Sequence, residues 1–136
     1  MQGIDEALTA LLRGDVELMV MVAGVHNTTA PYGAGYPQVL FQQISAVDEY
    51  TLSGLIATTY SYQIRVIGRG LDKEALNYAL EHIDYLLMDT VLTPDTIYCR
   101  REGEMPNMSP EMDAGVLYQQ VGATYRIEEN RQWETV

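Results

Sequence analysis

Residues 57–67, Ala57-Thr-Thr-Tyr-Ser-Tyr-Gln-Ile-Arg-Val-Ile67, decide the fold together with the helical pattern that follows them. The run alternates at period two, and its β-branched and aromatic residues predict a half-buried strand. Gly68-Arg-Gly70 ends the alternation, because glycine accommodates the positive φ angles of tight turns. The inner side of this central strand is expected to carry Tyr60, Tyr62, Ile64 and Val66.

The segment after Gly70 predicts an amphipathic helix that packs on the sheet. Asp72 is placed to cap it, and Glu74 lies in the first turn, where a carboxylate suits the helix dipole. Thr93-Pro94 predicts its end, because proline disfavours the helical conformation in the preceding residue. Burial of each Leu or Ile contributes about 1.5–3 kcal/mol, which is enough to bind the helix to a sheet face. The apolar stripe consists of Leu76, Ala79, Leu80, Ile83 and Leu87, widened by Leu86.

The remaining segments predict two N-terminal helices and three further strands. Ile4–Leu12 has a helical pattern. Val16–Ala23 is apolar nearly all round, so it is a buried helix or a strand; helix is favoured, and Asp15 is placed to cap it. Gly24–Pro37 predicts a loop with room for a short strand. Strands are expected at Gln38–Ala46, Thr96–Glu102 and Gly115–Glu129, and polar connections at Val47–Gly54 and Gly103–Ala114.

This order of elements predicts an α/β (α+β) fold. We expect a mostly antiparallel mixed sheet of about four to five strands, with helices packed on one face. The polar connection after Gln38–Ala46 predicts a hairpin with a long loop. The 136 residues predict a single domain over residues 1–129 and a polar C-terminal tail over residues 130–136.

The charge balance restricts the classes of partner. The chain has 8 Lys and Arg against 19 Asp and Glu, a formal net charge of −11. This excess argues against a protein that grips DNA and against a binder of anionic membranes. The single cysteine, Cys99, excludes an internal disulfide and is typical of a reducing cytoplasm. No signal peptide is expected, and the apolar run near Val16–Val25 is too short to span a bilayer.

The residues suited to catalysis or metal binding are isolated in the sequence. His82 has no carboxylate or thiol one helical turn away, which predicts an ordinary helix histidine, and His26 has no acid nearby. Cys99 lies in a strand pattern without a CxxC partner and is expected to be a small buried hydrophobe. Gly68-Arg-Gly70 lacks the third glycine of a dinucleotide fingerprint, since residue 73 is Lys. We therefore expect no cofactor, no metal and no enzymatic activity.

The two polar connections are the candidate contact surfaces. Tyrosine dominates the aromatic residues, with ten Tyr against one Phe and one Trp, and it is favoured at interfaces. A Met-bearing loop can repack against a partner, although methionines folded back on their own domain explain the pattern equally well. The candidate interface residues are Asp48, Glu49 and Tyr50 in the first connection and Glu104, Met105, Met108 and Met112 in the second.

Residues 4–129 resemble the tail terminator (tail completion) proteins of long-tailed, siphovirus-like bacteriophages. The resemblance lies in the order of the segments and in their residue types rather than in an invariant motif. It is carried by the helix Glu6–Leu12, the segment Tyr36–Phe41, the strand ending Tyr62-Gln-Ile-Arg-Val66, the helix with Ile83-Asp-Tyr-Leu-Leu87, and the closing strand Gly115–Ile127.

The resemblance implies a structural virion protein with a mixed sheet flanked by helices. It further implies assembly, in the host cytoplasm, of a six-fold ring that caps the tail tube, ends its polymerisation and joins the head. The implied partners are copies of the chain, the tail tube protein and the head-side connector or neck protein, while DNA passes without specific binding. Two alternatives remain: a neighbouring neck or head-completion adaptor, and a small α/β enzyme or ligand-binding module using Cys99 or His82.

Overall fold

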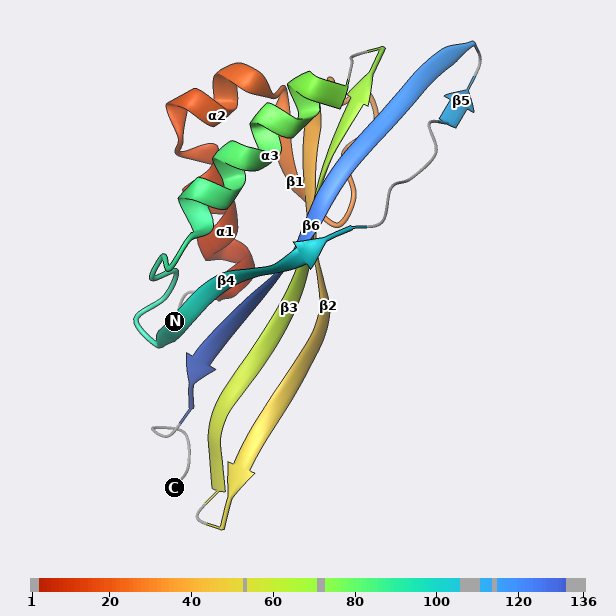
Figure 1. Cartoon of the computed structure of the whole chain (residues 1–136). Helices are drawn as coiled ribbons and strands as arrows, with labels where there is room; N and C mark the ends of the chain where they lie inside the picture. Colours follow the sequence, from red (N-terminus) through yellow and green to blue (C-terminus); the bar gives the residue numbers. More distant parts are fainter. Residues whose placement is uncertain (1–2, 53, 71–72, 106–110, 114, 132–136) are drawn as a thin grey trace.

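The computed structural model describes residues 3–52, 54–70, 73–105, 111–113 and 115–131. Within these ranges, helices lie on one face of a long, twisted mixed sheet (Figure 1). The predicted α/β (α+β) class is therefore confirmed. The helices are α1 (Ile4–Arg13), α2 (Val16–Met21) and α3 (Lys73–Leu87), and the strands are β1 (Gly24–Asn27), β2 (Gln38–Thr51), β3 (Gly54–Arg69), β4 (Thr96–Glu104), β5 (Glu111–Asp113) and β6 (Val116–Asn130).

The strands of the sheet run in the order β1-β2-β3-β6-β4, and β5 pairs with the start of β6. β1 and β2 are parallel, and the other described pairings are antiparallel. The mostly antiparallel mixed sheet is thus confirmed, and the short strand allowed for in the Gly24 segment is β1. The last long strand, β6, lies between β3 and β4, so the centre of the sheet joins segments that are far apart in the chain.

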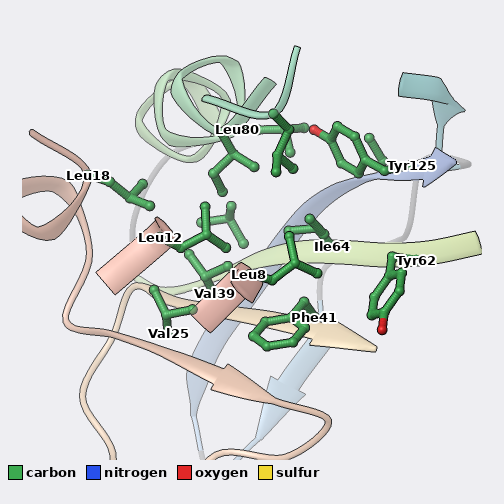
Figure 2. Close-up of a cluster of buried hydrophobic side chains, with 14 of the residues drawn as sticks. Leu8, Leu12, Leu18, Val25, Val39, Phe41, Tyr62, Ile64, Leu80 and Tyr125 are labelled. Atoms are coloured by element: carbon green, nitrogen blue, oxygen red, sulfur yellow. The ribbon is translucent and has the colours of Figure 1, made fainter. Parts of the chain in front are cut away.

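The core lies between the helices and the inner face of β3, as the two patterns predict. Tyr62, Ile64 and Val66 of β3 are buried, and Figure 2 shows Tyr62 and Ile64 beside Phe41, Leu8 and Leu12. The helix α3 buries Leu76, Ala79, Leu80, Ile83 and Leu87, with Leu86 packed at the edge of the core. These are the residues of the predicted stripe. Asp72, the predicted cap of α3, lies outside the described residues.

The end of α3 differs from the prediction. The helix ends at Leu87, well before Thr93-Pro94. Asp89 has a φ of 50°, which is the left-handed conformation that Asp tolerates better than most residues. Its backbone N–H donates to the carbonyl oxygen of Cys99 at 2.9 Å, so contact with β4 stabilises this helix end. The proline therefore has no part in stopping the helix.

The hairpin of β2 and β3 is longer than predicted. Its ladder continues through the pair Asp48 and Thr58 and closes at the pair Thr51 and Gly54, where Gly54 has a φ of 124°. The prediction of a long polar connection at Val47–Gly54 was therefore wrong. Charged residues are common on strands that stand in solvent, so their presence did not mark a loop here.

The second predicted connection, Gly103–Ala114, is also partly strand. β4 continues to Glu104, and β5 places Met112 opposite Leu117 of β6. Both strands pair along the side of β6 that faces away from β3. β6 is longer than β4, so its first residues have room for this second short partner.

Candidate interaction surface

The part of the hairpin that lies beyond the helices is the most exposed part of the sheet. We call it the distal hairpin, and it comprises Gln42–Thr51 of β2 and Gly54–Tyr60 of β3. β2 is buried from Gln38 to Phe41 and exposed from Gln42 onward. Asp5, in the first turn of α1, accepts a hydrogen bond from the Tyr62 hydroxyl, which marks where the helical layer ends. Figure 1 shows the distal hairpin extending past α1, α2 and α3.

Large apolar side chains are exposed on the distal hairpin and at its turn. Ile44 is 54% exposed, Val47 63% and Tyr50 65%, and Leu52 at the turn is fully in solvent. An exposed strand pair with such side chains is a template for association with another chain. This concentration makes the distal hairpin the candidate protein-contact surface.

Asp48, Glu49 and Tyr50, three of the predicted contact residues, lie on this surface but in a strand rather than a loop. The Thr58 hydroxyl donates to the Asp48 carboxylate at 2.8 Å, so Asp48 also supports its own hairpin. Glu49 and Tyr50 are exposed. A role for these residues in contacting a partner stays a prediction.

The other predicted contact residues lie away from the hairpin turn, with Glu104 level with Ile64 in the middle of the sheet and Met112 near its opposite end. Glu104 is exposed at the end of β4 and pairs with Arg101 at 3.1 Å. Met105 donates its backbone N–H to Gly122, and its sulfur lies 2.5 Å from where a Cβ of Gly122 would stand, so it packs on its own sheet. Met112 is exposed on β5, and Met108 lies outside the described residues. The structure therefore does not bring the two predicted groups together (Figure 1).

His82 has acidic partners that the sequence did not reveal. Its Nε2 lies 2.9 Å from Asp15 Oδ1, and its Nδ1 lies 3.7 Å from Glu17. The same Asp15 oxygen accepts the Leu18 backbone N–H at 2.9 Å, which confirms the predicted cap of α2. These hydrogen bonds lower the pKa of Asp15. The partners are remote in sequence, so only the packing of α2 on α3 brings them together, and the pair fastens the two helices.

Cys99 is fully buried, as predicted. Burial raises the pKa of its thiol to about 12, so it stays protonated at neutral pH and is a poor nucleophile. Nearby, the Asp84 carboxylate accepts hydrogen bonds from the Tyr125 hydroxyl and from Arg101, the latter at 2.7 Å. Burial raises the pKa of Asp84, an effect that the neighbouring Arg101 opposes. Both oxygens of this acid hold α3 against β4 and β6, which is a structural role.

Among the residues that the structure describes, no group of three or more His, Cys, Asp or Glu could hold a metal ion. None of the described helices is long and apolar enough to cross a membrane. His26 lies in the middle of β1, against Gly24 of the same strand.

A buried thiol, charged pairs that join elements and exposed strands fit a structural protein. Comparison with known families agrees: the chain belongs to the tail completion protein gp17 family, whose model matches residues 6–101. The predicted resemblance is thereby confirmed, and the family is one of bacteriophage tail structural proteins.

A solved structure shares the fold. A chain in the virion of a native gene transfer agent particle superposes with a TM-score of 0.73 at 15% identity, covering 91% of this chain and 92% of that chain. The structural similarity covers more of the chain than the family match over residues 6–101. At 15% identity it shows a shared fold alone. Among curated proteins, no sequence matches significantly.

Proposed function

We propose that the protein caps the phage tail tube as a ring of six copies, ends tail polymerisation and presents a surface to the head-side connector. Family membership supports a role in completing the tail. The observation that carries the ring is the distal hairpin, where Ile44, Val47 and Tyr50 are more than half exposed. Burying such side chains against a neighbouring chain is favourable in proportion to the apolar area removed from water.

The two ends of the sheet supply the two contact surfaces that such a cap needs. Tyr50 and Leu52 at the hairpin turn are the candidates for one, and Met112 on β5, at the end of β6 far from that turn, is the candidate for the other (Figure 1). We propose that one end meets the tail tube protein and the other meets the connector or neck protein. A ring with its faces at opposite ends of long strands joins two different neighbours without competition between them.

The net charge suits a ring through which DNA passes. Six copies carry six times the formal net charge of −11, and a negative surface repels the phosphate backbone rather than retaining it. We therefore propose that DNA traverses the ring without specific binding, that the protein has no catalytic role, and that it joins the virion neck after assembly in the host cytoplasm.

The experiment that tests this function uses purified tail tube protein of the same phage. Wild-type protein added during polymerisation is expected to shorten the tubes and appear as a cap at one end by electron microscopy. Light scattering of the purified protein is expected to give six times the protomer mass. If the ring forms only on the tube, six copies are expected at each capped tube end. Leu52→Ser should weaken capping if the hairpin turn contacts the tube, whereas Val20→Ser, at another exposed apolar residue, on α2, is the matched control.

The neck-adaptor alternative gives a different result. An adaptor binds the head-side connector and leaves tube length unchanged, and that outcome would overturn the terminator function. The same preparations therefore include a pull-down with the connector protein as bait, so that tube binding and connector binding are measured side by side.

A further inference from the structure

A pocket of about 720 Å³ lies on the side of the sheet away from the helices, which we call the open face. Strand residues alternate between the two faces, so Arg69 of β3 lies opposite to the inward Val66. Arg69 pairs with Tyr118 of β6, and Tyr118 pairs with Glu111, so the pocket is at the end of the sheet that carries β5. Ligand sites in proteins typically enclose roughly 300–1,000 Å³, so a short stretch of peptide has room here. The lining includes Tyr32, Tyr36, Gln38, Leu40, Arg69 and Tyr118.

The charge of this pocket is opposite to that of the chain. Among the described residues that line it, Arg69 is charged and none is acidic, although the chain has 19 acidic and 8 basic residues. Arg69 forms no ion pair with any residue that the structure describes. Arg65 lies on the same face of β3, with its Nη1 3.4 Å from Gln120 Oε1. The guanidinium of Arg69 therefore suits a carboxylate, which an arginine can bind with two parallel hydrogen bonds.

Gln38 adds an unsatisfied acceptor to the same pocket. It pairs with Ile67 of β3, which lies on the open face, and it is 6% exposed. Its side-chain Oε1 has no hydrogen-bond partner among the described residues. A buried polar atom without a partner is unfavourable, so an occupant that brings an N–H group to this amide gains binding free energy.

Tyrosine rings supply the apolar part of the pocket. The rings of Tyr36 and Tyr118 meet edge to face, with their centroids 5.5 Å apart and an interplanar angle of 62°. Tyr32, in the connection from β1 to β2, is fully exposed. Tyrosine combines a large apolar ring with a hydroxyl group, which suits it to contact surfaces that are partly wet. The pocket therefore offers an apolar surface beside the cation and the amide.

We propose that this pocket binds an extended, acidic segment of the head-side connector protein, with a carboxylate on Arg69 and a backbone N–H group on Gln38. A peptide supplies both groups. The phosphate backbone of DNA supplies acceptors alone, and one cation is too few to retain a duplex. The inference rests on the proposed function, which places a partner at each end of the sheet. With the hairpin turn on the tube, the end that carries Arg69 meets the connector.

Binding of the purified connector protein tests the pocket. Arg69→Glu should melt at the wild-type temperature, because the residue is exposed, and should bind the connector at least ten times more weakly by biolayer interferometry. Arg100→Glu makes the same change of charge at an exposed residue of β4. It is the matched control and should bind as the wild type does. Equal affinity of Arg69→Glu and the wild type would overturn the proposal.

Gln38→Met separates binding from stability. Methionine has a similar length and no acceptor oxygen, so the variant should melt at or above the wild-type temperature, because it removes a buried acceptor that has no partner among the described residues. The same variant should bind the connector at least three times more weakly. Wild-type affinity in a folded Gln38→Met protein would contradict the role given to this amide.

Photo-cross-linking identifies the occupant. A benzophenone amino acid in place of Tyr32 is irradiated in complex with the purified connector and, in separate samples, with tail tubes and with duplex DNA. We expect a link to a connector peptide that contains at least two Asp or Glu residues, and loss of that link when Arg69→Glu is added. A link to a connector peptide without acids, to the tube protein, to a second copy or to DNA would overturn the proposal, as would the absence of any link.

These outcomes distinguish the pocket from the proposed function. Capped tubes, together with connector binding that does not depend on Arg69, would refute the pocket and leave the function intact. Tubes of unchanged length, together with connector binding that is lost in Arg69→Glu, would refute the terminator function and leave the pocket intact. Tube length and connector affinity are therefore measured on the same preparations of each variant.

Discussion

Asp15 performs two tasks with one carboxylate oxygen. It accepts the Leu18 backbone N–H at the start of α2 and lies within hydrogen-bond distance of His82 on α3. Its pKa is lower than the ordinary 3.8, chiefly because of the bond from Leu18 and then because of His82. A group with a lowered folded pKa stabilises the fold above its ordinary pKa and loses that contribution as the pH falls through the folded value.

Replacing Asp15 should therefore have a pH-dependent effect. We expect Asp15→Ala to reduce the free energy of unfolding by about 1 kcal/mol at neutral pH, the usual effect of losing an N-cap. The difference from wild type should shrink below pH 3.8. Urea denaturation between pH 7 and pH 3 measures it. Asp15→Asn retains a capping side chain and should be nearly as stable as wild type; an equal loss in both variants would contradict the capping role.

Cys99 is expected to be dispensable for assembly. Its thiol is buried with a raised pKa, so Cys99→Ser should leave tube capping unchanged. It should lower the free energy of unfolding by about 1–3 kcal/mol, because a buried hydroxyl is introduced. Cys99→Ala separates the lost packing from the added polarity. Loss of capping in a folded Cys99→Ser protein would restore a chemical role for the thiol.

At the scale of elements, the packing of α3 depends on the buried face of the helix. Ile83 is fully buried and Leu80 nearly so, whereas Tyr78 on the same helix is 58% exposed. The buried face is packed against α1, β3 and β6, so it joins helices and sheet into a common core.

A charge on that face should unfold the protein. Ile83→Asp buries an unpaired carboxylate, which is severely destabilising, and we expect no cooperative thermal transition by circular dichroism. Leu80→Asp should behave in the same way. Tyr78→Asp is the control and should melt within a few degrees of wild type. A cooperatively melting Ile83→Asp protein would show that the helix face is misassigned.

The same elements show what sequence can and cannot predict. The stripe of α3 and the alternation of β3 were predicted because each pattern repeats within one local segment. The length of the hairpin was missed, since acids on a solvent-exposed edge resemble a loop. The His82 and Asp15 pair was missed because its members come from different helices. Asp48, Glu49, Tyr50, Glu104 and Met112 are exposed, yet they are spread over distant parts of the sheet. Their separation depends on the strand order and cannot be read locally, and their role in contacting a partner stays a prediction.

At the scale of the molecule, charge is unevenly distributed. The strand register places Arg65, Arg100 and Arg126 on the open face of the sheet, away from the helices with their acidic side chains. Acids accompany them there, as in the ion pair of Arg126 with Glu102 at 3.5 Å. The open face is therefore mixed in charge rather than basic, within a chain of net charge −11.

This distribution predicts no retention on DNA. We expect no mobility shift of a duplex at physiological salt, because tight binding requires several unpaired cations against the phosphates. Fluorescence anisotropy with a labelled duplex, and with single-stranded DNA in parallel, checks the result. A clear shift of the duplex at physiological salt would contradict the charge argument.

The position of β6 between β3 and β4 also has a consequence in time. β2 and β3 are neighbours in the chain and can pair as soon as both leave the ribosome, whereas β3 must wait for β6, which is made last. Pairings between distant segments slow folding, because a long loop must close before they form. The nascent chain therefore has an interval in which β3 has one unpaired edge, and the pace of synthesis sets how long each copy can pair with the wrong partner.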